Sequence, residues 1–152
     1  MPANGSSVAA SRTTRPISLA SPSSFQVVLR TYGLPESVIS ERLGDLETST
    51  PGLRLGYRLV PPEIDVKVRV RAADVTEARA AAERVSSEVR ARLGDVVFGD
   101  SDETYGGAVG RALRARGLTL AVAESCTGGL IGALLTSAPG ASEFLLLDAV
   151  TY

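Results

Sequence analysis

Apolar and polar residues alternate with a period of two over residues 63–71. The apolar positions of this run are Ile64, Val66, Val68 and Val70. Such alternation predicts a strand with one buried and one solvated face, and it places Lys67 on the solvated face. Residues 26–32 and 53–59 have the β-branched and aromatic content of two more strands. The inner side of the second of these would hold Leu53, Leu55, Tyr57 and Leu59.

Apolar residues at three- and four-residue steps predict a long helix over residues 78–93. Asp74 or Thr76 would cap this helix, and Gly94 would end it. A shorter helix before it and a short closing strand after it complete the pattern. Residues 25–100 are therefore predicted to form a small α+β domain.

Residues 1–24 are rich in Ser, Ala, Thr and Pro and show no sustained periodicity, so they are predicted to be a disordered tail. Arginines without acidic residues are also typical of an organelle transit peptide. Because composition of this kind is a weak targeting signal, we favour a non-native extension over a transit peptide.

Residues 101–152 follow as a second α/β unit. The predicted elements are a helix ending at Gly117, a strand over residues 118–123, a helix over residues 130–135 and a strand over residues 144–152. The first helix would begin at Asp100 or Ser101, with Glu103 in a capping contact. No charged residue occurs in the 18 positions after Glu124. Such a neutral stretch predicts elements packed inside a larger core, with only the turn between strand and helix reaching a pocket.

The composition narrows the class of protein. A formal net charge of −1 provides no bulk attraction to nucleic acid and leaves open only a weak local basic patch. No apolar run approaches the ~20 residues that cross a bilayer, so no membrane partner is expected. The single cysteine, Cys126, excludes an internal disulfide and fits a reducing, cytoplasmic compartment. We interpret Cys126 as a small buried residue beside a turn.

The turn over residues 123–129, with the sequence AESCTGG, is the segment most suggestive of chemistry. A glycine-rich turn that leads from a strand into a helix leaves backbone N–H groups that can hold a phosphate or an oxyanion. Ser125 and Thr127 add hydroxyl groups there. The alternative is an ordinary turn in which the glycines and hydroxyl residues have only a structural role.

This turn resembles the signature of the C-terminal domain of the CinA (competence/damage-inducible) family. Further matching stretches are residues 116–122 (RGLTLAV), 139–142 (PGAS) and 150–152 (VTY), with residues 29–37 (LRTYGLPES) similar to the start of the family's KH-like middle domain. The resemblance implies a KH-like α+β domain over residues 25–100. Residues 101–152 would then be an incomplete α/β amidohydrolase domain that is truncated at its end.

The resemblance implies hydrolysis of nicotinamide mononucleotide to nicotinic acid mononucleotide and ammonia, and we expect no cofactor and no metal ion. By this resemblance the catalytic residues would be Ser125 and Tyr152. The residues expected to bind the nucleotide would be Glu124, Thr127, Gly128, Gly129 and Ser142. Residues 25–100 lack the Gly-x-x-Gly loop of nucleic-acid-binding KH domains, so we interpret them as a structural spacer and expect no nucleic-acid partner.

Two departures from the family pattern concern the chemistry. Asp148 stands where the family has a small residue, and a carboxylate in an apolar strand is costly to bury unless it is paired. The second departure concerns the Ser/Asn-x-x-Lys stretch that in the family normally follows the matching tyrosine, because the lysine expected beyond Tyr152 is missing. The chain also has no histidine, and its one lysine, Lys67, lies in the first domain, so Ser125 lacks an obvious base. We expect this chain alone to be inactive. Two alternatives remain: a non-catalytic module that binds a nucleotide or a protein, and an inactive fragment. In each case the chain could self-associate through its last strand.

Overall fold

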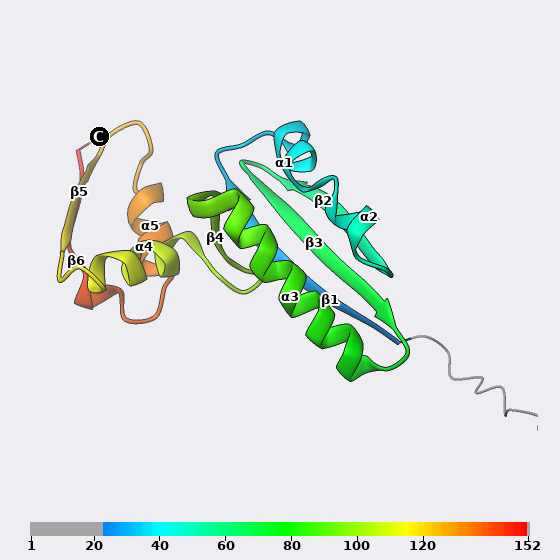
Figure 1. Cartoon of the computed structure of the whole chain (residues 1–152). Helices are drawn as coiled ribbons and strands as arrows, with labels where there is room; N and C mark the ends of the chain where they lie inside the picture. Colours follow the sequence, from blue (N-terminus) through cyan, green and yellow to red (C-terminus); the bar gives the residue numbers. More distant parts are fainter. Residues whose placement is uncertain (1–22, 152) are drawn as a thin grey trace, which may run out of the picture.

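The computed structural model describes residues 23–151, which form two modules that each contain a sheet (Figure 1). The tail predicted over residues 1–24 lies outside the described residues, except for Ser23 and Ser24, which begin the first strand. Tyr152 also lies outside them. The mixture of helices and strands confirms the predicted α+β class.

The first module is a four-stranded antiparallel sheet in the order β2-β3-β1-β4. Its strands are β1 (Ser23–Tyr32), β2 (Leu53–Val60), β3 (Glu63–Ala72) and β4 (Val97–Asp100). Three helices cover one face of this sheet, namely α1 (Glu36–Leu43), α2 (Leu46–Ser49) and α3 (Val75–Leu93), and a short η1 (Gly94–Val96) follows α3. The other face has no helix over it in Figure 1.

The alternation in β3 has the predicted consequence. Its four apolar side chains are buried beneath the helices, together with Leu29 of β1 and Val89 of α3. The prediction for β2 is wrong at Leu59, which is exposed. Leu59 lies at the hairpin end of an edge strand, where only β3 flanks it.

The long helix begins and ends at predicted residues. The side chain of Asp74 accepts a hydrogen bond of 2.8 Å from the backbone N–H of Glu77, so Asp74 rather than Thr76 is the N-cap. Gly94 follows Leu93 with φ +61°, a conformation that glycine adopts without strain. Local signals were sufficient here because a cap acts within one turn of the helix.

The second module contains two parallel strands and two helices. Its elements are α4 (Tyr105–Arg114), β5 (Leu120–Glu124), α5 (Leu130–Thr136), η2 (Ala141–Glu143) and β6 (Leu145–Val150). The predicted start of α4 is wrong: Thr104, not Asp100 or Ser101, is the N-cap, and its hydroxyl accepts from the backbone N–H of Gly107 at 3.0 Å. Glu103 forms an ion pair with Arg111 of α4, and its carboxylate accepts a hydrogen bond of 3.2 Å from the backbone N–H of Thr104, so its capping contact is with Thr104 and not with Asp100.

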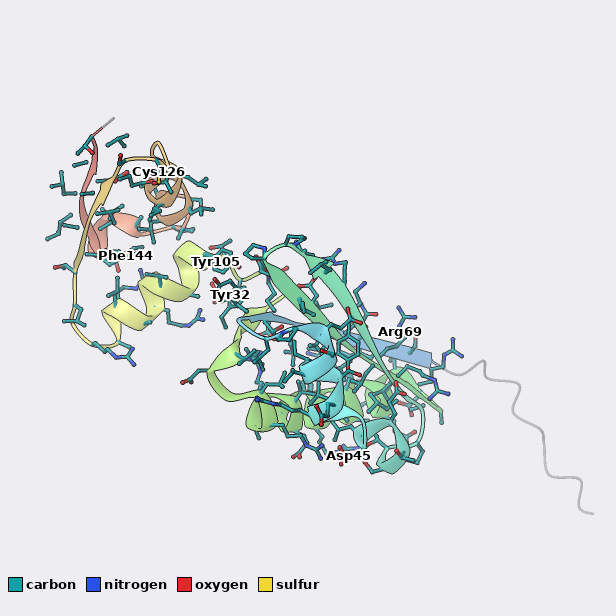
Figure 2. The ribbon with its side chains drawn as sticks, turned by 90° about the horizontal axis from the view of Figure 1, so that it is seen from above. Tyr32, Asp45, Arg69, Tyr105, Cys126 and Phe144 are labelled. Carbon is teal, nitrogen blue, oxygen red and sulfur yellow. The ribbon has the colours of Figure 1, made fainter. Side chains whose placement is uncertain are left out.

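The core of the second module is small. Phe144 is fully buried and, with Leu135 and Ala138, lies between α4 and α5 (Figure 2). The expectation of a neutral stretch packed within a larger core does not hold for the described residues. Six large apolar side chains of α5 and β6 are exposed, namely Leu130, Ile131, Leu134, Leu146, Leu147 and Val150. These side chains are exposed because the two strands β5 and β6 cover only one side of the short helix α5.

Aromatic rings connect the modules locally. Tyr105 of α4 stacks on Phe98 of β4, with ring centroids 5.1 Å apart, and meets the edge of Tyr32 at 6.1 Å. Figure 2 shows Tyr32 and Tyr105 next to each other at this junction. Within residues 23–151, no helix combines the length and apolar character that a membrane crossing needs.

Candidate functional site

The signature turn lies where β5 ends and α5 begins, at the carboxyl edge of the parallel strand pair. Gly128 and Gly129 have φ values of +61° and +94°, which other residues adopt only with strain. The turn is closed by hydrogen bonds from the Gly128 N–H to the Ser125 carbonyl and from the Leu130 N–H to the Thr127 carbonyl. Both glycines are therefore required by the path of the chain, whatever the turn binds.

Glu124 anchors the helix that follows the turn. Its side chain is buried, and its two carboxylate oxygens accept hydrogen bonds from the backbone N–H groups of Gly132, at 2.7 Å, and Ile131, at 3.0 Å. The sequence predicted that amides at this helix terminus would be open to a phosphate or an oxyanion. For these two amides the prediction is wrong, because a carboxylate of the same chain already occupies them.

The environment of Glu124 keeps it ionised. Burial by itself would raise the pKa of Glu124, but hydrogen bonds from the Gly132 amide, the Thr127 hydroxyl and the Ile131 amide outweigh this effect. Together they lower the pKa to about 2. The result is a fixed negative charge beneath the turn, next to Ser125, where a phosphate would be repelled rather than attracted.

The carbonyl group of Glu124 connects the ends of both strands. It accepts one hydrogen bond from the Thr151 backbone N–H, at 2.8 Å, and another from the Thr151 hydroxyl, at 3.0 Å. Thr151 belongs to the matching stretch 150–152 but was not among the predicted site residues; the signal that could have found it is a hydroxyl residue immediately after an apolar strand. Tyr152, the second predicted catalytic residue, follows it and lies outside the described residues.

Asp148 of β6 faces the same carboxylate. Burial raises the pKa of Asp148, and the negative charge of Glu124 raises it further. Its Oδ1 atom is buried without a hydrogen-bond partner in residues 23–151, and Oδ2 lies over Gly132, where any larger residue would collide with it. The concern that this carboxylate would lack a compensating partner is therefore justified for its ionised form, since its neighbour is another carboxylate; only protonated Asp148 can donate a hydrogen bond to Glu124.

The hydroxyl and thiol residues of the turn lie at the surface, although the Thr127 hydroxyl reaches the Glu124 carboxylate. Ser125, Thr127 and Cys126 are all exposed, so the interpretation of Cys126 as a buried residue is wrong (Figure 2). Cys126 lies in the turn itself rather than beneath it. An exposed Ser125 at the end of a strand is accessible to a ligand.

The structure does not bring all the predicted site residues together. Ser142 lies in η2, just before β6, whereas Ser125 follows the other end of the parallel partner strand β5. The two residues are thus at opposite ends of the parallel strands, Ser142 at their amino ends and Ser125 at their carboxyl ends. Lys67 lies in β3 of the first module, and no group of three metal-ligating side chains occurs in the described part of the chain.

The architecture defines a protein with an antiparallel, helix-backed module followed by an α/β module that carries a strand-turn-helix site. The family model described as "Damage-inducible protein CinA KH domain" matches residues 26–99, and the "CinA C-terminal domain" model matches residues 102–152. The chain belongs to the CinA family.

Curated relatives agree with this assignment. The chain is 43% identical over 124 residues to a CinA-like protein of Desulfosudis oleivorans, a match that covers 82% of this chain and 30% of the relative. A CinA-like protein of Geobacter metallireducens is 43% identical over 126 residues, with 83% and 30% covered. A putative competence-damage inducible protein of Symbiobacterium thermophilum is 37% identical over 124 residues, with 82% and 29% covered. The chain thus spans about 30% of the length of these relatives.

Proposed function

We propose that residues 102–152 supply the nucleophile to a nicotinamide-nucleotide amidohydrolase site, with nicotinamide mononucleotide as the substrate. The observation that carries the proposal is the position of Ser125: it is exposed, and it follows a strand end that Glu124 and Thr151 hold in place. A nucleophile on a rigid element at the carboxyl edge of parallel strands suits covalent catalysis. The reaction type rests on the resemblance of this turn to the signature of the CinA C-terminal domain, whose family model covers it.

In this reaction the Ser125 hydroxyl oxygen attacks the carbonyl carbon of the nicotinamide carboxamide. The carbon–nitrogen bond then breaks, ammonia leaves with the proton taken from the hydroxyl, and water releases nicotinic acid mononucleotide from the serine ester. A base must accept the serine proton. Residues 102–152 contain neither histidine nor lysine, so a base of either kind would come from outside this segment.

The tetrahedral intermediate carries a negative oxygen that needs hydrogen-bond donors, and the first amides of α5 cannot supply them because they are already bonded. Glu124 takes the N–H groups of Ile131 and Gly132. The Thr127 hydroxyl and the Gly129 N–H also point to Glu124, and the Gly128 N–H donates to the Ser125 carbonyl. We still assign the substrate contacts to Thr127, Gly128 and Gly129, which requires that the bound substrate displaces these hydrogen bonds within the turn.

A second candidate is a protein-interaction module without catalysis. The exposed leucines of α5 and β6 favour it, because contiguous apolar surface marks contact sites. The absence of histidine and lysine in the second module points the same way. If the second module, placed in a full-length relative, supports catalysis, the first candidate is favoured; if it does not, the second is.

The decisive experiment is a chimera in which residues 102–152 replace the matching segment of the Geobacter metallireducens relative. We expect ammonia release from nicotinamide mononucleotide within about tenfold of the parent relative, and a loss of ~10³-fold or more with Ser125→Ala. Ser137→Ala is the matched control, because Ser137 is an exposed serine at the end of α5, and its effect should be less than about twofold. Unchanged turnover in Ser125→Ala, or a parent without the activity, would overturn the proposal.

A further inference from the structure

The sheet of the first module has one face without helices. Alternate residues of β1, β2 and β3 project there, and we call this surface the open face. Figure 2 shows Arg69 on the side of the sheet away from α1, α2 and α3. The described side chains of the open face include the cations Arg30, Arg54, Arg58, Lys67, Arg69 and Arg71 and the carboxylates Glu63 and Asp65.

Charge is unevenly distributed over this surface. Both carboxylates are already paired, Glu63 with Arg30 and Asp65 with Arg58. The other four cations, Arg54, Lys67, Arg69 and Arg71, take part in no ion pair within residues 23–151. The formal net charge of −1 for the whole chain therefore conceals a strongly positive face.

Two of these cations directly oppose each other. Arg54 and Arg69 are register partners on β2 and β3, and like charges at such positions destabilise a strand pair. The Arg69 guanidinium is held by the neutral side-chain oxygen of Gln26, at 2.8 and 3.1 Å, and not by a carboxylate. An anion between the two guanidinium groups would remove the repulsion.

The surface is hollowed at this place. Gly56 stands opposite Lys67, and because glycine has no side chain a hollow of about 150 Å³ opens there, lined also by Arg54 and Arg69. A neighbouring hollow of about 300 Å³ is lined by Gly52, Arg54, Arg69 and Arg71. The two hollows thus share the opposed pair of arginines.

The cations also form a line. Lys67, Arg69 and Arg71 are two residues apart on one strand, so their Cα atoms repeat at about 7 Å, a spacing similar to that of phosphates in an extended single strand. On β1 the open face ends in Tyr32, opposite Glu63 and in contact with the ring of Tyr105 on one side; the ring is 54% exposed, and a base could stack on this exposed part. A linear polyanion with flat rings fits this arrangement better than an acidic peptide.

We propose that the open face binds single-stranded nucleic acid through its phosphate backbone, laid along β3 over the Arg54–Arg69 pair. Binding would be independent of sequence, since the contacts are with phosphates and a single ring. The sequence-based expectation of no nucleic-acid partner depended on net charge and on a missing loop. The net charge no longer argues against binding, because the positive charges are gathered on one face. The missing Gly-x-x-Gly loop does not argue against it either, because the open face binds without that loop.

The test measures fluorescence anisotropy of a labelled oligothymidylate of about 12 nucleotides with the full chain. If four cations contact phosphates, affinity should fall about 50-fold between 50 and 200 mM salt. The Arg54→Gln/Arg69→Gln double variant should weaken binding at least about tenfold at low salt and reduce the salt dependence by about half. Circular dichroism verifies that the variant is folded.

The matched control is Arg84→Gln/Arg116→Gln, which removes the same charge from exposed arginines outside the open face. It should bind nearly as tightly as the wild type. Equal losses in the two double variants, or no loss in Arg54→Gln/Arg69→Gln, would overturn the proposal, because binding would then follow net charge or another segment. Poly-glutamate serves as a competitor at the same charge concentration. If it displaces the labelled strand as effectively as unlabelled oligonucleotide does, the open face would be assigned to an acidic protein instead.

Discussion

The carboxylate of Glu124 accepts a hydrogen bond of 2.7 Å from the backbone N–H of Gly132, eight residues later in the chain. This contact joins the end of β5 to the first turn of α5 across the signature turn. A carboxylate at this end of the helix also interacts favourably with the helix dipole. The orientation of Ser125 therefore depends on a residue whose charge is directed inward.

Glu124→Gln should loosen the start of α5. A neutral amide accepts hydrogen bonds more weakly than a carboxylate, and one of its groups is a donor that would face backbone N–H groups. We expect the amide protons of Ile131 and Gly132 to exchange about tenfold faster, as measured by hydrogen exchange. Glu143→Gln, a change in an exposed carboxylate, should leave these rates unaltered.

The effect of Glu124→Gln should depend on pH in a defined direction. The pKa of Glu124 is lowered in the folded state, from 4.5 to about 2, so its stabilising contribution is fully present above pH 4.5. It is lost as the pH falls from 4.5 towards 2. Exchange measured at pH 6 and pH 3 should therefore show a smaller difference between wild type and variant at pH 3; an equal difference would contradict the assignment of charge.

Asp148→Ala should stabilise the second module. The pKa of Asp148 is raised above 3.8 in the folded state, so ionisation of this carboxyl group as the pH rises opposes folding. Removing it should raise the Tm by about 3 °C at pH 7 and by less at pH 3, as followed by thermal unfolding. A lower Tm at pH 7 would mean that Asp148 has a favourable partner.

Gly110→Ala should destabilise the second module, although alanine favours helices by about 1 kcal/mol over glycine. A Cβ atom at Gly110 would overlap the buried ring of Phe144, so α4 could no longer approach this core. We expect a net loss of about 1–3 kcal/mol in denaturant unfolding. Gly107→Ala is the control and should cost less, because there the new methyl group meets the end of the Glu103 side chain and the Thr104 hydroxyl, both at the surface, and not the buried core.

Leu146→Glu should suppress self-association. Leu146 is 68% exposed on β6, next to the exposed Leu147, and an apolar strand of this kind is a template for pairing with a second copy. Sedimentation velocity of the wild type at about 100 μM should show dimers or larger species, which the charge of the variant repels. Val75→Glu, at a similarly exposed apolar residue of the first module, should change nothing. A monomeric wild type would contradict the prediction.

Much of the fold could be predicted from sequence because its signals are local. Alternation over β3 determined which face is buried, and the cap at Asp74 and the glycine at Gly94 set the limits of α3. The strand-turn-helix order around Ser125 was predicted for the same reason. Each of these features depends on residues within one or two turns of the chain.

Only the tertiary structure decided which groups meet. It directed the carboxylate of Glu124 onto the α5 amides, placed Ser142 at the opposite end of the parallel strands from Ser125, and set Arg54 against Arg69. These relations depend on strand register and on the direction of a crossover connection. Neither is encoded in the periodicity of a single segment, because both result from packing between segments that are distant in the sequence.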